Sequence, residues 1–384
     1  MWPPRHFADN AEDTKPMRTD ISRMPLVDAL KAVACLLIVS HHLAFYGPMS
    51  DLAYPLAPGM IDWLYEYGRM AVQVFFVVSG FLLAGKLAPR GASLVADPVQ
   101  AIKRRYVRLA VPYLAALTLA IGCAALARSW MVHEAIPDTP DLPQLLAHAL
   151  LLQDLLDQEA LSAGVWYVAV DFQLFALAAI LLWLSGQIER RHPGLKAIAP
   201  VLIAGLTMAS LFVFNRDESW DETAFYFFGS YGLGMLSYWA SDRPRRALWL
   251  ALLAMLVVAA LLADFRARIA VAGMVALMLG MSRQYDGLKS WPVPDSLTYL
   301  GRISYSIFLI HFPLILIVNA AFFRFFPHQP AIAVFGLVLA FCISIAGGAL
   351  FFRWVESRQL TDKARLWLPA GFVTTGLLAA LGGG

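Results

Sequence analysis

The sequence has little charge for its length. Asp, Glu, Lys and Arg together make up 15% of its 384 residues, whereas hydrophobic residues make up 59%. A soluble protein of this size needs far more charge on its surface, so the composition excludes that class and indicates a multi-pass membrane protein. The net charge of +3 is also too small to indicate a nucleic-acid partner.

Cysteine is scarce as well. Cys35, Cys123 and Cys342 each fall within an apolar segment, and no Cys-x-x-Cys pair occurs. An odd number of such thiols argues against a disulfide framework, and we predict packing roles for them and no metal site. The first 22 residues are polar without an apolar stretch, so we interpret residues 1–23 as a flexible cytoplasmic tail, not a cleavable signal peptide.

What the sequence does contain is long apolar runs. We expect an all-α fold, a polytopic bundle of about ten transmembrane helices that forms one domain over residues 24–358. The predicted spans lie near 25–46, 66–87, 106–127, 165–185, 197–214, 224–240, 247–263, 267–282, 298–320 and 331–354. Residues 359–384 form a last segment, in which the short apolar stretch 366–381 is either an interfacial helix, which we favour, or an eleventh crossing.

The basic residues between the spans predict an orientation. Most of them fall on the side that carries both chain ends. The other side has only Arg69, Arg128, Arg216, Arg266, Arg268 and Arg324. Because basic loops stay in the cytoplasm, we predict that both termini are cytoplasmic. We expect the longest loop of the outer side, residues 128–164, to cap the outer opening of the bundle.

The first apolar helix carries ionisable groups that a membrane helix rarely holds. Lys31 and His42 are eleven positions apart, which places them within about 20° of one helix face and roughly 16 Å apart along the axis. Charged groups inside a span are costly and usually mark a functional path. The pair is therefore predicted to mark two levels of one polar passage, whereas His41 points about 80° away from Lys31.

Two arginines open the third span. Arg105 and Arg108 are three positions apart in the run KRRYVRLAVP, so their guanidinium groups can project together from one helix face. Such a pair suits a ligand rich in phosphate, because each guanidinium can hold phosphate oxygens with two hydrogen bonds. The alternative is that both arginines anchor the helix at the lipid headgroups.

The fourth and ninth spans add further polar groups. Asp171 follows Trp166 and Tyr167 at the start of the fourth span, at a predicted depth close to that of His42. A carboxylate beside a histidine fixes the tautomer of the ring and stabilises its cation, so we expect the two to pair. The alternative for Asp171 is a structural hydrogen bond to a neighbouring helix.

The ninth span reads GRISYSIFLIHFPL and contains Ser304, Tyr305 and His311. Seven positions separate Ser304 from His311, which places them on nearly the same helix face. Together with Ser79 in the second span, these residues are candidates for the lining of the passage. A purely structural hydrogen bond is the alternative for His311.

Five of these motifs occur in an order that resembles the acyltransferase type 3 family of membrane acyltransferases. They are LVDALKAVACLLIVSHH, VQVFFVVSGFLL, RRYVRLAVP, WYVAVDFQLF and GRISYSIFLIHFPL. The similarity extends over residues 24–358 and ends with RWVESR, which resembles the closing motif of the family at Glu356.

The resemblance implies an enzyme that passes an acyl group from cytoplasmic acyl-CoA to a sugar hydroxyl of an envelope glycan. An Arg-x10-His motif of the family corresponds to Lys31 and His42, and its Arg-x-x-Arg motif implies that Arg105 and Arg108 contact the phosphates of CoA. The sequence departs from the family at two positions, because Lys31 replaces arginine and Asp171 stands where many members have glutamate.

We therefore expect an O-acyltransferase of the bacterial cytoplasmic membrane. Its donor is acyl-CoA, its acceptor is a glycan or a lipid-linked sugar, and no cofactor is permanently bound. His42 acts as the general base, assisted by Asp171, and Arg105, Arg108 and Lys31 bind the donor. Direct transfer and a transient acyl-enzyme both remain open. The alternatives are a transporter of glycans or small anions and a non-catalytic protein with the same scaffold.

Overall fold

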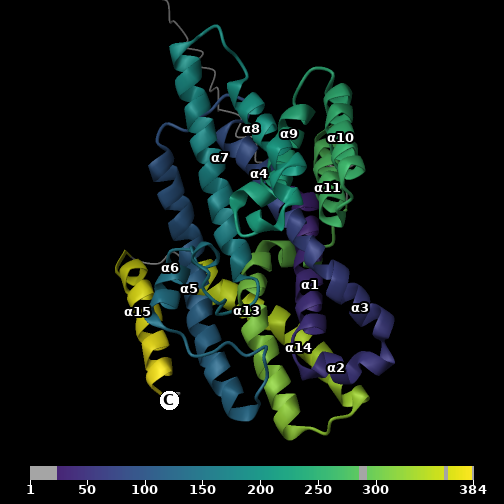
Figure 1. The fold of residues 1–384 in the computed structure, drawn as a ribbon, viewed down its shortest axis with the longest axis vertical. Coiled ribbons are helices and arrows are strands. Elements are labelled where there is room, and N and C mark those ends of the chain that lie inside the picture. Colours follow the sequence, from purple (N-terminus) through teal and green to yellow (C-terminus); the bar gives the residue numbers. More distant parts are fainter. Residues whose placement is uncertain (1–23, 285–291, 359–361, 383–384) are drawn as a thin grey trace, which may run out of the picture.

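The computed structural model describes residues 24–284, 292–358 and 362–382, and in these residues it contains helices and no strand (Figure 1). The predicted tail, residues 1–23, lies outside the described residues. The helices are α1 (Pro25–Phe45), α2 (Pro48–Ala53), α3 (Pro58–Tyr67), α4 (Val72–Leu87), α5 (Pro98–Trp130), α6 (Leu142–Ala149), α7 (Val165–Arg191), α8 (Ile198–Phe212), α9 (Ala224–Ser241), α10 (Arg246–Ala263), α11 (Ala267–Gln284), α13 (Asp295–Phe325), α14 (Pro330–Phe351) and α15 (Asp362–Gly382).

The prediction of an all-α polytopic bundle is confirmed. Among the described residues, eight helices are long and apolar enough to cross a membrane. The other two predicted spans correspond to α9 and α11, which are helical but less apolar. Helix α9 contains Gly229, Ser230, Gly232 and Gly234 and is buried along nearly its whole length against α4, α8 and α11. Because other helices rather than lipid surround it, α9 does not need an apolar surface.

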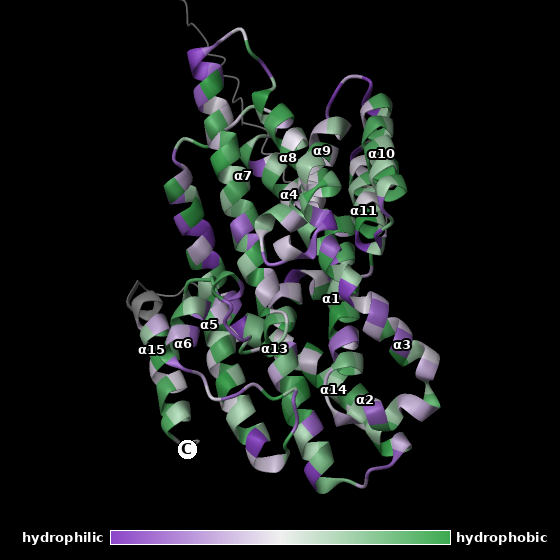
Figure 2. Ribbon diagram, in the orientation of Figure 1, coloured by the Kyte–Doolittle hydropathy of each residue, from purple (hydrophilic) through white to green (hydrophobic). Residues whose placement is uncertain are grey.

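Prolines and caps in the sequence set many of the helix starts. Proline occupies the first turn of α1, α2, α3, α5 and α14, where its missing N–H leaves no hydrogen bond unmade. The carboxylates of Asp97 and Asp141 accept the backbone N–H groups of Gln100 and Gln144 at the starts of α5 and α6. Hydrophilic residues gather on the first turns of α5 and at the far end of α7 (Figure 2).

Helices α1 and α13 pack along each other in the same direction. The thiol of Cys35 contacts the carbonyl oxygen of Ser304 at 3.4 Å, and seven residues further along each helix His42 contacts His311 at 2.6 Å. Because seven residues make nearly two helical turns, the two helices meet twice on the same faces. This register brings together two histidines that are 269 residues apart in the sequence.

Helices α4 and α9 cross at very short range. A Cβ atom added at Gly80 would meet the carbonyl oxygen of Tyr231, and one added at Gly234 would meet that of Val77. The side chains of Gln73 and Ser230 are hydrogen bonded across the same contact at 2.6 Å. Small residues allow two membrane helices to approach closely, and here they seat α4 against the buried α9.

Helices α5 and α7 run antiparallel with a large offset, and an ion pair joins Arg105 to Asp171 (Figure 1). Helix α5 continues for about 37 Å beyond Arg105, whereas α7 begins only about 9 Å before Asp171. The connection must therefore return along α5, and the hydroxyl of Tyr106 donates to the carbonyl of Ala149 at 2.6 Å. The prediction that the loop of residues 128–164 caps the outer end is wrong, because part of it lies at the level of Tyr106.

Helix α15 covers the predicted C-terminal stretch and packs on α5 and α6. Phe372 is buried there, and Gly376 faces the side chain of Leu145. Its apolar portion, Trp367–Leu381, is shorter than the spans. The interfacial position and the cytoplasmic side of the termini stay predictions.

Gly80→Val should destabilise the bundle, because the new side chain has no space against the Tyr231 carbonyl. We expect a loss of about 1–3 kcal/mol, seen as a lower melting temperature of the purified protein in detergent. Gly122→Val is the matched control, since nothing lies within 4 Å of a Cβ at that position. Equal melting temperatures for the two variants would contradict the close crossing of α4 and α9.

The connection between α5 and α7 also predicts a pH dependence. Burial raises the pKa of Asp154 to about 6, although Gln153 donates a hydrogen bond to its carboxylate at 3.0 Å. A carboxyl whose pKa is raised in the fold costs stability once it ionises, so stability is lost as pH rises from about 4 through 6. Asp154→Asn should therefore match the wild type near pH 4 and exceed it by about 1 kcal/mol at pH 8, after allowing for solvent screening. Thermal unfolding across this range checks the prediction, and a constant difference at all pH values would contradict it.

Candidate active site

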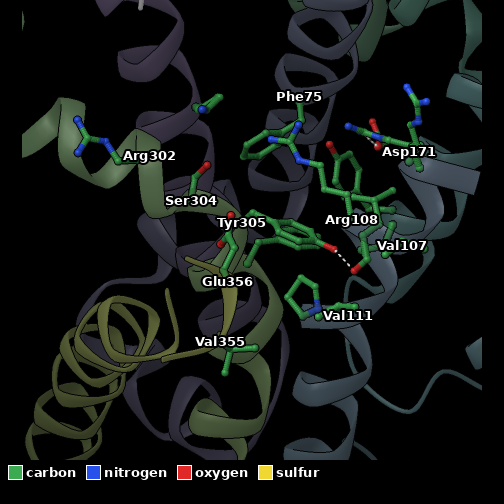
Figure 3. A pocket seen from close by; sticks show the side chains of 18 of the residues that line it. Phe75, Val107, Arg108, Val111, Asp171, Arg302, Ser304, Tyr305, Val355 and Glu356 are labelled. Carbon is green, nitrogen blue, oxygen red and sulfur yellow. Dashed lines mark hydrogen bonds and ion pairs between the residues drawn. The ribbon is translucent and has the colours of Figure 1, made fainter. Parts of the chain in front are cut away.

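A cavity of about 870 Å³ opens between α1, α5, α7, α13 and the π-helical turn Phe352–Glu356. In Figure 3, Ser304 and Tyr305 of α13 lie across the cavity from Arg108 and Val107 of α5. The polar and charged residues of the lining are Lys31, Gln100, Lys103, Arg104, Arg105, Arg108, Tyr167, Asp171, Arg302, Ser304, Tyr305, Glu356 and Arg358. Asp171 and five other predicted site residues, which come from three of the motifs, therefore line one cavity. The five are Lys31, Arg105, Arg108, Ser304 and Tyr305.

The cavity carries a strong excess of positive charge. Of the described residues that line it, seven are lysine or arginine, whereas only Asp171 and Glu356 are acidic. Lys31 also contacts Asp28 at 3.1 Å, which offsets part of its charge. A recess lined in this way attracts polyanions and holds their phosphate groups through charge-assisted hydrogen bonds.

Arg105 and Asp171 form an ion pair in the wall of this cavity. The Nη2 atom of Arg105 donates to Oδ2 of Asp171, and the guanidinium lies 5.4 Å from the ring centroid of Phe175. The side chain of Asp171 is only 4% exposed and that of Arg105 is 23% exposed. Since an unpaired charge is costly at such a depth, the two charges are buried together as a pair.

The expected pairing of Asp171 with His42 is therefore not observed. Asp171 lies at the level of Arg105, because α7 begins inside the bundle and not at its outer end. His42 instead pairs with His311 through a contact of 2.6 Å between Nδ1 of His42 and Nε2 of His311. The two rings are parallel to within 3° with centroids 4.9 Å apart, and with this short contact they lie edge to edge.

The hydrogen bonds of His311 determine which nitrogen of His42 is basic. The Nδ1 atom of His311 lies 2.7 Å from the carbonyl oxygen of Phe308 and 3.2 Å from that of Ile307. Carbonyl oxygens only accept, so Nδ1 of His311 carries its proton and Nε2 accepts one from Nδ1 of His42. The Nε2 atom of His42 is then left with a lone pair that can take up a proton.

An aromatic layer separates the cavity from the histidine pair. Phe75, Tyr167 and Phe308 line the cavity and contact one another, with ring centroids 5.1–6.3 Å apart. Phe308 also packs on His311 with a centroid distance of 5.8 Å. Neither histidine belongs to the described lining of the cavity, so this layer closes the end of the cavity that faces them.

The remaining predicted residues have structural hydrogen bonds. Ser304 and Tyr305 line the cavity, but their hydroxyls donate to the carbonyls of Gly301 at 2.9 Å and Leu109 at 3.1 Å. Ser79 lies outside the described lining, beside Tyr167. Among the described residues, no group of three or more histidine, cysteine or carboxylate side chains is placed to hold a metal ion.

Glu356 was not among the predicted site residues, although its closing motif had marked it. It lies in the π-helical turn at the end of α14, lines the cavity, and accepts a hydrogen bond from the hydroxyl of Ser306 at 2.5 Å. The sequence contained one signal for it, because a carboxylate follows directly on an apolar span.

Long apolar helices around a cationic cavity define a multi-pass membrane protein with a site suited to a polyanion. The chain belongs to the acyltransferase type 3 family, whose model, described as an acyltransferase domain, matches residues 25–381. The match covers nearly the whole chain, so the protein is a membrane acyltransferase and the resemblance found in its motifs is confirmed. No curated protein and no solved structure matches the chain.

Proposed function

We propose that this acyltransferase moves a short acyl group, chiefly acetyl, from cytoplasmic acyl-CoA to a hydroxyl of an envelope glycan or lipid-linked sugar. The observation that carries the proposal is a cationic cavity that ends one aromatic layer away from a histidine pair with a free basic nitrogen. A bacterial cytoplasmic membrane, with both termini and the basic loops inside, is part of the proposal. Family membership favours acyl transfer over the transporter alternative.

The donor is proposed to bind with its phosphates at the basic residues of the cavity. Arg108, Arg104 and Lys103 lie on α5, and Arg302 lies on α13 across from them. The phosphates of CoA match this charge, and a guanidinium holds a phosphate through two parallel hydrogen bonds. Lys31 completes the set from α1. The pantetheine arm then extends past Asp171 toward the aromatic layer.

His42 is proposed to act as the general base. Its Nε2 atom takes the proton of the acceptor hydroxyl while the hydroxyl oxygen attacks the thioester carbonyl. The carbon–sulfur bond breaks, and the proton passes from the imidazolium to the departing thiolate, which gives free CoA and an ester. His311 acts as a positioning residue, because it fixes the tautomer of His42 and shares the charge that develops.

The thioester reaches His42 only if the aromatic layer moves. Phe75, Tyr167 and Phe308 touch the cavity on one side, and Phe308 touches His311 on the other. A rearrangement of one or more of these side chains connects donor and base. The aromatic side chains are also suited to keeping water from the reacting groups.

Release of CoA thiol by the purified protein tests the reaction. With acetyl-CoA and a glycan acceptor we expect turnover by the wild type and a loss of 10²-fold or more in His42→Ala, the usual range for a general base. His311→Ala should lower the rate, and His311→Gln should recover part of it, because the glutamine carbonyl also accepts from Nδ1 of His42. Unchanged activity of His42→Ala at normal expression would exclude His42 as the base.

Donor binding tests the phosphate site separately. Arg108→Gln should weaken acetyl-CoA binding about tenfold, the effect of losing a hydrogen bond between charged groups. Arg190→Gln is the matched control, because this exposed arginine lies at the end of α7, outside the cavity lining. Isothermal titration in detergent measures both, and equal affinities would reject the assignment of Arg108.

A further inference from the structure

The ion pair in the cavity wall leaves two polar atoms without a partner. Arg105 and Asp171 are joined by one hydrogen bond, from Nη2 to Oδ2. In the described part of the chain, Nε of Arg105 and Oδ1 of Asp171 are buried and find no hydrogen-bond partner. An arginine and a carboxylate often meet through two parallel bonds, which would use both of these atoms. Here the wall of the cavity retains one unused donor and one unused acceptor.

Such atoms indicate that a ligand completes the site. A buried carboxylate oxygen without a donor costs free energy, and the same holds for a buried N–H without an acceptor. A ligand that supplies one donor and one acceptor within reach of the pair satisfies both at once. The N–H and the carbonyl of one trans secondary amide point in opposite directions, so two neighbouring amides suit the pair, one giving its N–H and the other its carbonyl oxygen.

We propose that Arg105 and Asp171 form a subsite for the two secondary amides of the pantetheine arm of the acyl-CoA donor. The N–H of one amide donates to Oδ1 of Asp171, and the carbonyl of the other accepts from Nε of Arg105. This inference rests on the proposed function, because it concerns the same cavity and the same donor. It gives both residues a role in recognising the arm, in place of catalytic assistance by Asp171 and phosphate binding by Arg105.

The place of the pair along the cavity supports the donor arm as its ligand. On α5, the basic residues Lys103 and Arg104 precede Arg105, and on α7, Tyr167 of the aromatic layer precedes Asp171 by one turn; because the two helices run antiparallel, these neighbours lie on opposite sides of the ion pair. The pair therefore stands between residues suited to phosphate and the layer that covers the histidines. An arm that joins a phosphorylated nucleotide to a thioester must pass this point if its two ends occupy those positions.

Analogues of acetyl-CoA in which one pantetheine amide is replaced by an ester test the subsite. The ester keeps the carbonyl but has no N–H, so for one of the two amides the wild type should lose about tenfold or more in kcat/KM. Asp171→Asn should reduce this preference to less than about twofold, because the asparagine amide that replaces Oδ1 cannot accept the N–H. Asp62→Asn, an exposed carboxylate outside the cavity lining, is the matched control and should keep the preference.

A second variant guards against a folding defect. The double substitution Arg105→Gln with Asp171→Asn leaves no unpaired charge and should likewise lose the preference, while remaining soluble and monodisperse in detergent. Equal use of amide and ester donors by the wild type overturns the inference, and so does an unchanged preference in both variants. A change in the KM of the acceptor alone would also overturn it. Failure of the wild type to release thiol from acetyl-CoA would instead overturn the proposed function.

Discussion

The ion pair between Arg105 and Asp171 determines where the site lies in the bundle. Two charges of opposite sign that are buried among helices must meet, because either one alone carries a desolvation cost of several kcal/mol. Their contact sets the offset between α5 and α7. The offset in turn places the start of α7 at the cavity and requires the loop after α5 to return along that helix. The position of the cavity wall thus follows from one electrostatic constraint.

The contact between His42 and His311 orients the proposed base. Parallel packing of α1 and α13 brings His42 against His311, and two backbone carbonyls one turn before His311 fix its proton on Nδ1. In a helix, the backbone carbonyls three and four residues before a buried histidine can accept the proton of its Nδ1 atom. No carboxylate is therefore needed to fix the tautomer. The protein thereby obtains an oriented base in a region where an additional charge would be costly. Asp171 takes no part in this pair and is bound to Arg105 instead.

Much of the fold was predictable from the sequence. Each of the ten apolar segments is a helix, because an apolar run of this length has few other ways to satisfy its backbone in lipid. The position of each helix along the axis of the bundle was less predictable. Helix α5 begins at Pro98, eight residues before the predicted span, and the loop of residues 128–164 folds back. Apolar length shows that a segment crosses the membrane, but not where its helix begins relative to its neighbours.

The candidate site was also predictable only in part. Lys31, Arg105, Arg108, Ser304 and Tyr305 meet in the cavity, as their positions near the ends of spans suggested. The partner of His42 was not predictable, because no periodicity relates residues 269 positions apart and the packing register of α1 on α13 alone decides it. The predicted pairing of Asp171 with His42 rested on their similar predicted depth in the membrane. It is wrong because α7 is offset along α5, which brings Asp171 to Arg105.

The central claim is that one continuous path leads from the cationic cavity through the aromatic layer to His42. A structure of the protein with an unreactive thioether analogue of acetyl-CoA tests it most directly. We predict phosphates at Arg108 and Arg302, displaced side chains at Phe75 or Phe308, and the acyl end beside Nε2 of His42. An analogue that ends below an unmoved aromatic layer, or binds outside the cavity, would contradict the account.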